Sequence, residues 1–209
     1  MIKNIFMNSL NRIPGYSLCE YLLVLSPHED LRNKIKGLKR EFSETYKTTA
    51  GLYDKPVITL AIFTQYALTE DRIIQHLHTI AMGAKPIKIE MKDFGSFPAH
   101  TIYINVTSKL PIQGLVKQIR SSAQKLMKLD ADHKPHFLSE PHINIARKLQ
   151  PWQYEKGWLE YSHRSFTGRF IADAMLLLKR PAGELKYQIA ARFEFQHLPV
   201  ATTQGELFG

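Results

Sequence analysis

Two four-residue segments, residues 57–60 (Val-Ile-Thr-Leu) and 142–145 (His-Ile-Asn-Ile), constrain the fold more than any other feature of the sequence. Each segment follows a proline, and in each the residues alternate in character. Successive side chains of a β-strand point to opposite faces, so the valine and the threonine share one face, as do the histidine and the asparagine. The two segments therefore predict two equivalent strands with unequal chemistry, 85 residues apart (142 minus 57).

Patterns of strands and helices surround the two segments. Ser26-Pro27, with a glutamate three residues after the serine, is typical of a helix start, with the serine as the cap. Thr69 is expected to cap a second helix that Gly83 closes. Pro111 opens a third. The expected strands are residues 20–25, 57–63, 87–91, 100–106, 142–146, 166–179 and 185–196, the expected helices are 27–46, 70–83, 111–128 and a short one around 152–158, and turns are expected at 93–98 and 181–183. This order predicts an α+β fold of two related halves rather than a doubly wound parallel sheet.

Composition sets the outer limits. A chain of 209 residues can bury an ample core, and we expect an N-terminal extension (1–16), a single domain of two lobes (17–198) and a flexible tail (199–209). The net charge of +9 favours polyanionic partners without identifying one. Cys19 is the only cysteine, which excludes an internal disulfide and fits a cytoplasmic setting. No segment has the apolar run of a signal peptide or a membrane span.

Residues 55–60 and 140–147 resemble the paired His-x-Thr/Ser-x motifs of the two-histidine phosphoesterase superfamily, which includes the RNA 2′,3′-cyclic phosphodiesterases, also called 2′-5′ RNA ligases. The resemblance extends over about residues 18–197, through the segment at 94–98, the helix after Pro111 and the closing strand at 175–179. It implies a bilobal, pseudo-two-fold α+β fold. Two antiparallel sheets would carry helices on their outer faces, and both motif strands would line a central cleft.

The resemblance also implies a chemistry. Each motif histidine serves as one half of an acid/base pair, and the hydroxyl two residues on holds a phosphate oxygen. This chain has Val57 in place of the first histidine and Asn144 in place of the second hydroxyl. Asparagine can still donate to a phosphate oxygen, whereas valine can neither give nor take a proton. The expected catalytic residues are His142, Thr59 and Asn144.

Three further residues are expected to bind substrate: Arg147, His100 and Tyr103. His100 is also the leading candidate to replace the missing histidine, the alternative being that it is an edge or surface residue. No second histidine or carboxylate at a fixed spacing supports a metal site, so neither a metal nor another cofactor is expected. The exposed face of the third helix is basic. It is either a solvated face or a surface that contacts RNA. Its residues are Lys117, Arg120, Lys125 and Lys128.

Three functions remain open. The first is a phosphoesterase-like enzyme acting on cyclic phosphates or 2′-5′ linkages of RNA or nucleotides. The second is an inactive relative that binds RNA ends or nucleotides, and Val57 favours it. The third is an interaction module without a specific ligand. The expected partner is RNA or a nucleotide with a cyclic or 2′-linked phosphate, with no membrane association, and the expected oligomeric state is a monomer.

Overall fold

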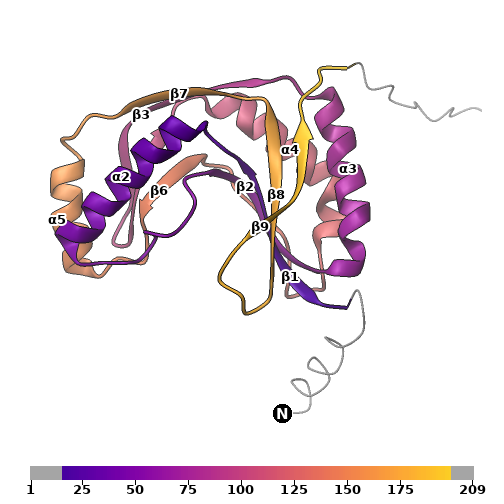
Figure 1. Cartoon of the computed structure of the whole chain (residues 1–209), viewed down its shortest axis with the longest axis horizontal. Helices are drawn as coiled ribbons and strands as arrows, with labels where there is room; N and C mark the ends of the chain where they lie inside the picture. Colours follow the sequence, from indigo (N-terminus) through magenta and orange to yellow (C-terminus); the bar gives the residue numbers. More distant parts are fainter. Residues whose placement is uncertain (1–15, 199–209) are drawn as a thin grey trace, which may run out of the picture.

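The computed structural model describes residues 16–198, which form two antiparallel sheets (Figure 1). In sheet A the strand order is β5-β2-β1-β8-β9, and in sheet B it is β6-β4-β3-β7. The strands of sheet A are β1 (Leu18–Leu25), β2 (Ile58–Tyr66), β5 (His136–Phe137), β8 (Ala174–Pro181) and β9 (Gln188–Glu194), and those of sheet B are β3 (Ile87–Phe97), β4 (Thr101–Val106), β6 (His142–Ala146) and β7 (Thr167–Ala172). The predicted α+β architecture of two antiparallel sheets is confirmed.

Two helices pack against each sheet. Helices α2 (Glu29–Tyr46) and α5 (Pro151–Tyr161) pack on β6 and β4 of sheet B, whereas α3 (Glu70–Gly83) and α4 (Lys109–Met127) pack on β9 and β2 of sheet A. A short 3-10 helix, η1 (Ala67–Thr69), precedes α3. The helices are exchanged between the halves, because α2 follows a strand of sheet A and packs on sheet B, and α4 does the reverse. Each sheet is therefore covered in part by a helix that follows a strand of the other sheet.

The two motif segments alternate between core and site as predicted. Ile58 and Leu60 are buried, as are Ile143 and Ile145. The residues between them, including Val57 and the polar members of both segments, are half-buried. Hydrophobic burial of the isoleucines and the leucine therefore fixes which face of each strand carries the polar side chains.

The start of α2 differs from the expectation. The N-cap is His28 rather than Ser26, because the ring Nδ1 of His28 accepts a hydrogen bond from the backbone N–H of Leu31 (3.4 Å). The Ser26 hydroxyl instead accepts a hydrogen bond from Arg32 (3.3 Å). The start of α4 is also earlier than expected, at Lys109, two residues before Pro111.

Residues 93–98 were expected to form a turn, and this prediction was wrong. β3 continues to Phe97, with a bulge between Met91 and Phe94. Asp93 at the bulge has a left-handed backbone (φ 58°), and its N–H donates to the carbonyl of Phe166 (2.7 Å). The bulge accommodates the extra residues between Met91 and Phe94 without ending the strand. The turn to β4 follows at residues 98–100, where Ala99 has φ 70°.

The single strand expected at 166–179 was also wrong. The segment forms β7 of sheet B and β8 of sheet A, separated at Asp173. β7 pairs with β3, and β8 pairs with β1 and β9. The crossing has no clear sequence signal, because Asp173 is a single polar residue between two strands that both bury apolar side chains.

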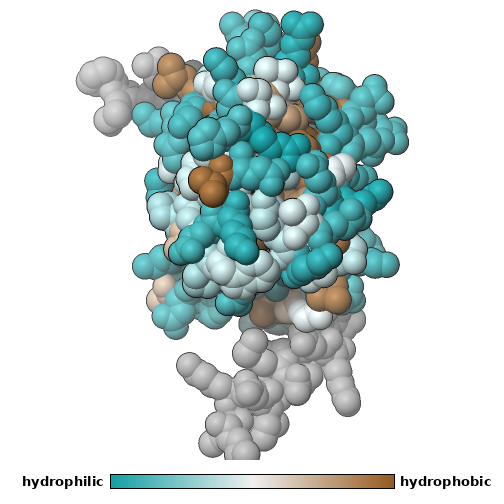
Figure 2. Space-filling model, turned by 90° about the vertical axis from the view of Figure 1, so that its left-hand side faces the viewer, coloured by the Kyte–Doolittle hydropathy of each residue, from teal (hydrophilic) through white to brown (hydrophobic). Residues whose placement is uncertain are grey.

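The predicted extension (1–16, except Tyr16) and tail (199–209) lie outside the described residues. Within residues 16–198, no helix has both the length and the apolar character that crossing a membrane requires. Seen from the side on which α2 and α5 lie, the surface is mostly hydrophilic and its apolar residues are scattered (Figure 2). That side therefore presents no broad apolar patch.

Candidate functional site

His142 and Asn144 lie on β6, the edge strand of sheet B, on the face away from the buried isoleucines. The register of β6 with β4 places Asn105 opposite His142 and Tyr103 opposite Asn144. We call this set, with Phe97 of β3, the site face. The sheet thus gathers two carboxamides, an imidazole and a phenol from segments about forty residues apart in sequence.

Two aromatic rings enclose the imidazole of His142. The ring centroid of Phe97 lies 5.1 Å from that of His142 in an edge arrangement, and the ring centroid of Tyr103 lies 4.9 Å away. Gly95 makes this arrangement possible, since a Cβ there would come within 2.6 Å of both the Tyr103 ring and the Asn105 side-chain oxygen. The imidazole is therefore held in one orientation by packing.

One hydrogen bond defines the protonation of His142. Its Nδ1 lies 2.7 Å from the backbone carbonyl oxygen of Glu140. A carbonyl can only accept, so Nδ1 carries the proton and Nε2 keeps its lone pair in the neutral ring. Burial lowers the pKa of His142, and the hydrogen bond to the Glu140 carbonyl opposes this shift in part. At neutral pH the side chain is thus an uncharged base.

Asn144 brings an unpaired polar atom to the site face. Its side-chain oxygen is buried and has no hydrogen-bond partner among residues 16–198. The neighbouring Asn105 differs, because its amide donates to the Phe94 carbonyl (2.9 Å). An unpartnered buried polar atom is costly, about 1–3 kcal/mol, and a polar ligand would relieve this cost.

Arg147, at the end of β6, is held by a loop that precedes β2. We call residues 47–57 the rim loop. The guanidinium of Arg147 binds both carboxylate oxygens of Asp54. Burial alone would raise the pKa of Asp54, but the hydrogen bonds and charge of Arg147 hold it below its usual value. Arg147 is therefore a paired cation at the margin of the site, with part of its side chain still exposed.

A buried lysine of α2 anchors the rim loop. Lys39 is only 2% exposed, and its ammonium donates to the carbonyls of Gly51 (2.8 Å) and Asp54 (2.9 Å). Burial lowers the pKa of Lys39 to about 8. Gly51 has φ 89° and packs against the backbone of Arg147. Lys39 thus positions the loop that carries Asp54, and Asp54 in turn orients Arg147.

Thr59 lies on β2 of the other sheet, and Val57 immediately precedes that strand. β2 and β6 contact each other, and the N–H of Leu138, just before the second motif, donates to the carbonyl of Leu60 (3.0 Å). Thr59 is half-buried, and its hydroxyl is not engaged by any side chain or backbone group in the described part of the chain. The structure therefore brings the strand of Thr59 and the strand of His142 together, as the pairing of the two segments predicts.

His100 lies elsewhere. It is exposed in the turn between β3 and β4, and its Nδ1 is 2.6 Å from the hydroxyl of Thr101. The residue of β4 that faces His142 is Asn105, five positions further on, which corresponds to about 16 Å along a strand. This position gives His100 no access to His142, and it corresponds to the surface alternative.

Four residues of this region were not among the expected site residues: Phe97, Asn105, Asp54 and Lys39. Lys39 could have been found, because it continues the helical row of Ile35 and Phe42 onto the buried face. The others depend on sheet register and on loop packing, which the sequence pattern does not encode.

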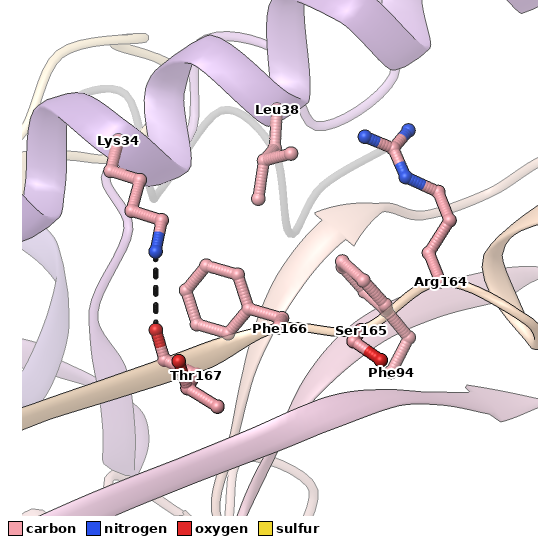
Figure 3. A pocket seen from close by; sticks show the side chains of 7 residues that line it. All are labelled: Lys34, Leu38, Phe94, Arg164, Ser165, Phe166 and Thr167. Atoms are coloured by element: carbon pink, nitrogen blue, oxygen red, sulfur yellow. Dashed lines mark hydrogen bonds between the residues drawn. The ribbon is translucent and has the colours of Figure 1, made fainter.

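A separate half-open pocket of about 210 Å³ lies between α2 and the start of β7 (Figure 3). The rings of Phe94 and Phe166 line it, and the ammonium of Lys34 donates to the carbonyl of Thr167 (3.2 Å) at one side. Arg164 at the other side is paired with Glu41 (2.7 Å). None of the site-face residues lines this pocket.

The side chains of residues 16–198 contain no group of three or more histidines, cysteines or carboxylates that could hold a metal ion.

Comparison of the sequence with protein families gives one result. The family model of the 2′-5′ RNA ligase superfamily matches residues 27–184, which include both motif segments and all residues of the site face. No curated protein matches the sequence significantly.

Solved structures share the fold. E. coli LigT in its apo form has a TM-score of 0.62 at 13% identity, covering 85% of this chain and 98% of LigT. LigT complexed with 3′-AMP has a TM-score of 0.59 at 12% identity, covering 86% of this chain and 98% of LigT. A protein of Thermus thermophilus has a TM-score of 0.54 at 16% identity, covering 85% of this chain and 98% of that protein. At these identities the likeness concerns the fold alone.

Proposed function

The chain belongs to the 2′-5′ RNA ligase superfamily, and on that premise we propose that it binds nucleotides or RNA ends with a 2′,3′-cyclic or 2′-linked phosphate on the site face. His142 acts as the one acid/base group, and the protein hydrolyses cyclic phosphodiesters slowly. Thr59 and Asn144 hold phosphate or ribose oxygens, and Tyr103 and Arg147 bind the remainder of the ligand. The protein is a cytoplasmic monomer that needs no metal or other cofactor.

The proposal rests on the protonation and the packing of the His142 ring. Its Nδ1 is engaged by the Glu140 carbonyl, its Nε2 is a free base, and two aromatic rings hold it in place. A histidine that merely fills a core needs no such arrangement beside an unpaired carboxamide. Attack of water on a cyclic phosphate requires a base of this kind.

The ligands of structural relatives agree with the proposed ligand class. LigT has been crystallised with 3′-AMP, with NADP⁺ and with phosphate, all of which carry a phosphate group. The net charge of +9 in the present chain favours such anions. Nucleotide phosphates are therefore the class of ligand to test first.

Val57 determines how fast the reaction can be. Hydrolysis of a cyclic phosphate uses a base for water and an acid for the leaving oxygen, and loss of one positioned acid or base costs ~10²–10⁴-fold in rate. Val57 cannot supply the second group, and His100 lies in the exposed turn before β4, five positions from Asn105, the residue of β4 that faces His142. We therefore expect hydrolysis slower by this factor than in a protein with both histidines.

A second function is favoured by the same valine. The site face binds a nucleotide or RNA end without turning it over, since binding requires the hydrogen-bond donors and acceptors but not the acid/base pair. The two functions share ligand and site, so one set of measurements distinguishes them.

The test compares wild type with His142→Ala. We expect wild type to bind a 2′,3′-cyclic nucleotide by calorimetry and to hydrolyse it slowly, and His142→Ala to lose at least ~10²-fold in turnover. The exposed His76 of α3 offers a matched control, and His76→Ala is expected to equal wild type. Binding without turnover in wild type would support the binding-only function. If neither binding nor turnover occurs, the site face does not recognise this class of ligand.

A further inference from the structure

Helix α4 is positively charged over its whole length. Its 19 residues include four cations and no carboxylate. Lys109 alone among these cations forms an ion pair within residues 16–198, with Glu140 (2.7 Å). The other exposed cations, with one that follows the helix, define what we call the α4 basic face: Lys117, Arg120, Lys125 and Lys128.

These cations share one side of the helix. At 100° per residue, they fall within an arc of about 140°, and Lys117 and Lys128 lie about 16 Å apart along the axis. The same arc includes Gln124 and Ser121, which are exposed hydrogen-bonding side chains. A stripe of this length and composition can contact several phosphates of one strand.

Helix α4 contacts the segment that leads into the site. Gln113 donates to the carbonyl of Ser139 (2.8 Å), and the guanidinium of Arg120 lies over the ring of Phe137 (5.5 Å). Both contacted residues belong to the segment that leads into His142. The far end of α4 lies at the far end of β2, since Gln65 donates to the carbonyl of Lys128 (3.2 Å). The helix therefore runs from the second motif along β2 (Figure 1).

The surface chemistry favours nucleic acid over a membrane. A helix that lies on a lipid surface needs large apolar residues on its outward side. On α4 the one exposed large apolar residue is Leu110, in the first turn, seven residues before the α4 basic face begins at Lys117. The face offers charge and hydrogen bonds without an apolar strip.

The geometry points to α4 as a binding surface for the body of a single-stranded RNA whose terminal phosphate occupies the site face. This inference rests on the proposed function and narrows its ligand from a nucleotide to an RNA of several nucleotides. The end of the strand is recognised at His142, and the preceding phosphates follow the α4 basic face by charge complementarity.

The test removes three cations whose side chains form no hydrogen bond or ion pair within residues 16–198, in the variant Lys117→Gln/Lys125→Gln/Lys128→Gln. Its probes are a 2′,3′-cyclic mononucleotide and an RNA of about 12 nucleotides with the same terminus. We expect wild type to bind the RNA more tightly than the mononucleotide. The variant should lose on the order of 10-fold in RNA affinity, and its slope of log K against log salt should fall by about 2, because each single-strand contact contributes about 0.7. Its affinity for the mononucleotide should not change.

The matched control removes the same charge from helices on the other sheet, in Lys36→Gln/Arg40→Gln/Lys156→Gln. We expect the control to keep most of the RNA affinity. Equal losses in the two variants would overturn the inference, as would RNA binding no tighter than mononucleotide binding, or tighter binding to anionic vesicles than to RNA.

The two proposals fail separately. RNA binding that depends on α4, with no mononucleotide binding, would support the α4 surface and contradict the proposed function of the site face. Mononucleotide binding, without RNA binding that depends on α4, would support the proposed function of the site face and contradict the proposed role of α4. If wild type binds neither probe, both proposals are wrong.

Discussion

At the scale of single residues, His142 is the group on which the site depends. A carbonyl at Nδ1 and two aromatic neighbours leave Nε2 as its one free nitrogen. Phe97 and Tyr103 contribute the burial that keeps the ring neutral. A base of this kind can activate water, but no second imidazole lies opposite it in the first motif.

His142 should titrate below its usual range. Burial lowers its pKa from the ordinary value of 6.5, so the neutral ring with the proton on Nδ1 should dominate at pH 7. Long-range ¹H–¹⁵N NMR spectra recorded across a pH series report both the pKa and the tautomer. Detection of the proton on Nε2 would show that the Glu140 carbonyl does not set the tautomer, and a pKa above 6.5 would show that burial does not dominate the pKa of the ring.

Lys39 should make the stability depend on pH. Its pKa is about 8 in the folded chain and 10.5 when unfolded, so between these values the unfolded state binds more protons. The stability of wild type should therefore rise from pH 8 to 10.5, by at most about 3 kcal/mol. Lys39→Met removes this contribution.

Urea unfolding of both proteins at several pH values checks this. The difference in unfolding free energy between wild type and Lys39→Met should change in favour of wild type as the pH rises. A difference that stays constant would mean that Lys39 is not buried as the structure has it.

At the scale of elements, the site depends on the close contact of β3 with β4. Gly95→Ala would place a methyl group against Tyr103 and Asn105. The ring of Tyr103 contacts that of His142, and Asn105 lies opposite His142 on β4. We expect a loss of about 1–3 kcal/mol in stability and weaker nucleotide binding. Gly114→Ala on α4 is the control, because a Cβ there meets nothing within 4 Å. It should gain about 0.5–1 kcal/mol, and thermal unfolding measures both. Equal stability of the two variants would contradict the packing of β3 on β4.

The elements themselves were largely predictable, and the exceptions have physical causes. Within residues 16–198, amphipathic periodicity identified α2, α3 and α4, aromatic residues marked the short α5, and alternation identified both motif strands. The turn expected at 93–98 failed because a bulge at Asp93 allows β3 to continue. The strand expected at 166–179 failed because local pattern does not show that a chain crosses from one sheet to another at Asp173. The two-residue strand β5 is defined only by its pairing with β2.

The candidate site was predictable in part, for a similar reason. His142, Asn144 and Thr59 were expected from the alternation of the two motif segments and their resemblance to the paired motifs, and Tyr103 lies beside His142. Asn105 and Phe97 join the site through sheet register, and Asp54 through a loop, which are long-range features. His100 was a candidate for the second histidine because it precedes a strand, but it lies in the turn at the start of β4, whereas the residue that faces His142 is Asn105, near the other end of that strand.

At the scale of the whole molecule, the exchange of α2 and α4 between the sheets joins both motifs to one framework. α2 anchors the rim loop through Lys39, and α4 contacts the segment that leads into His142. The second motif is therefore positioned by helices from both halves.

We propose that the site face is a phosphodiester site that lacks one histidine, at Val57. The most direct test is the rate at which Val57→His hydrolyses an RNA ending in a 2′,3′-cyclic phosphate, compared with wild type and with Val57→Gln, which has no group that can transfer a proton at neutral pH. We expect a gain of ~10²–10⁴-fold in rate for Val57→His alone, and we expect this gain to be abolished when His142→Ala is added. A Val57→His protein that folds, binds the RNA and is no faster than Val57→Gln would contradict it.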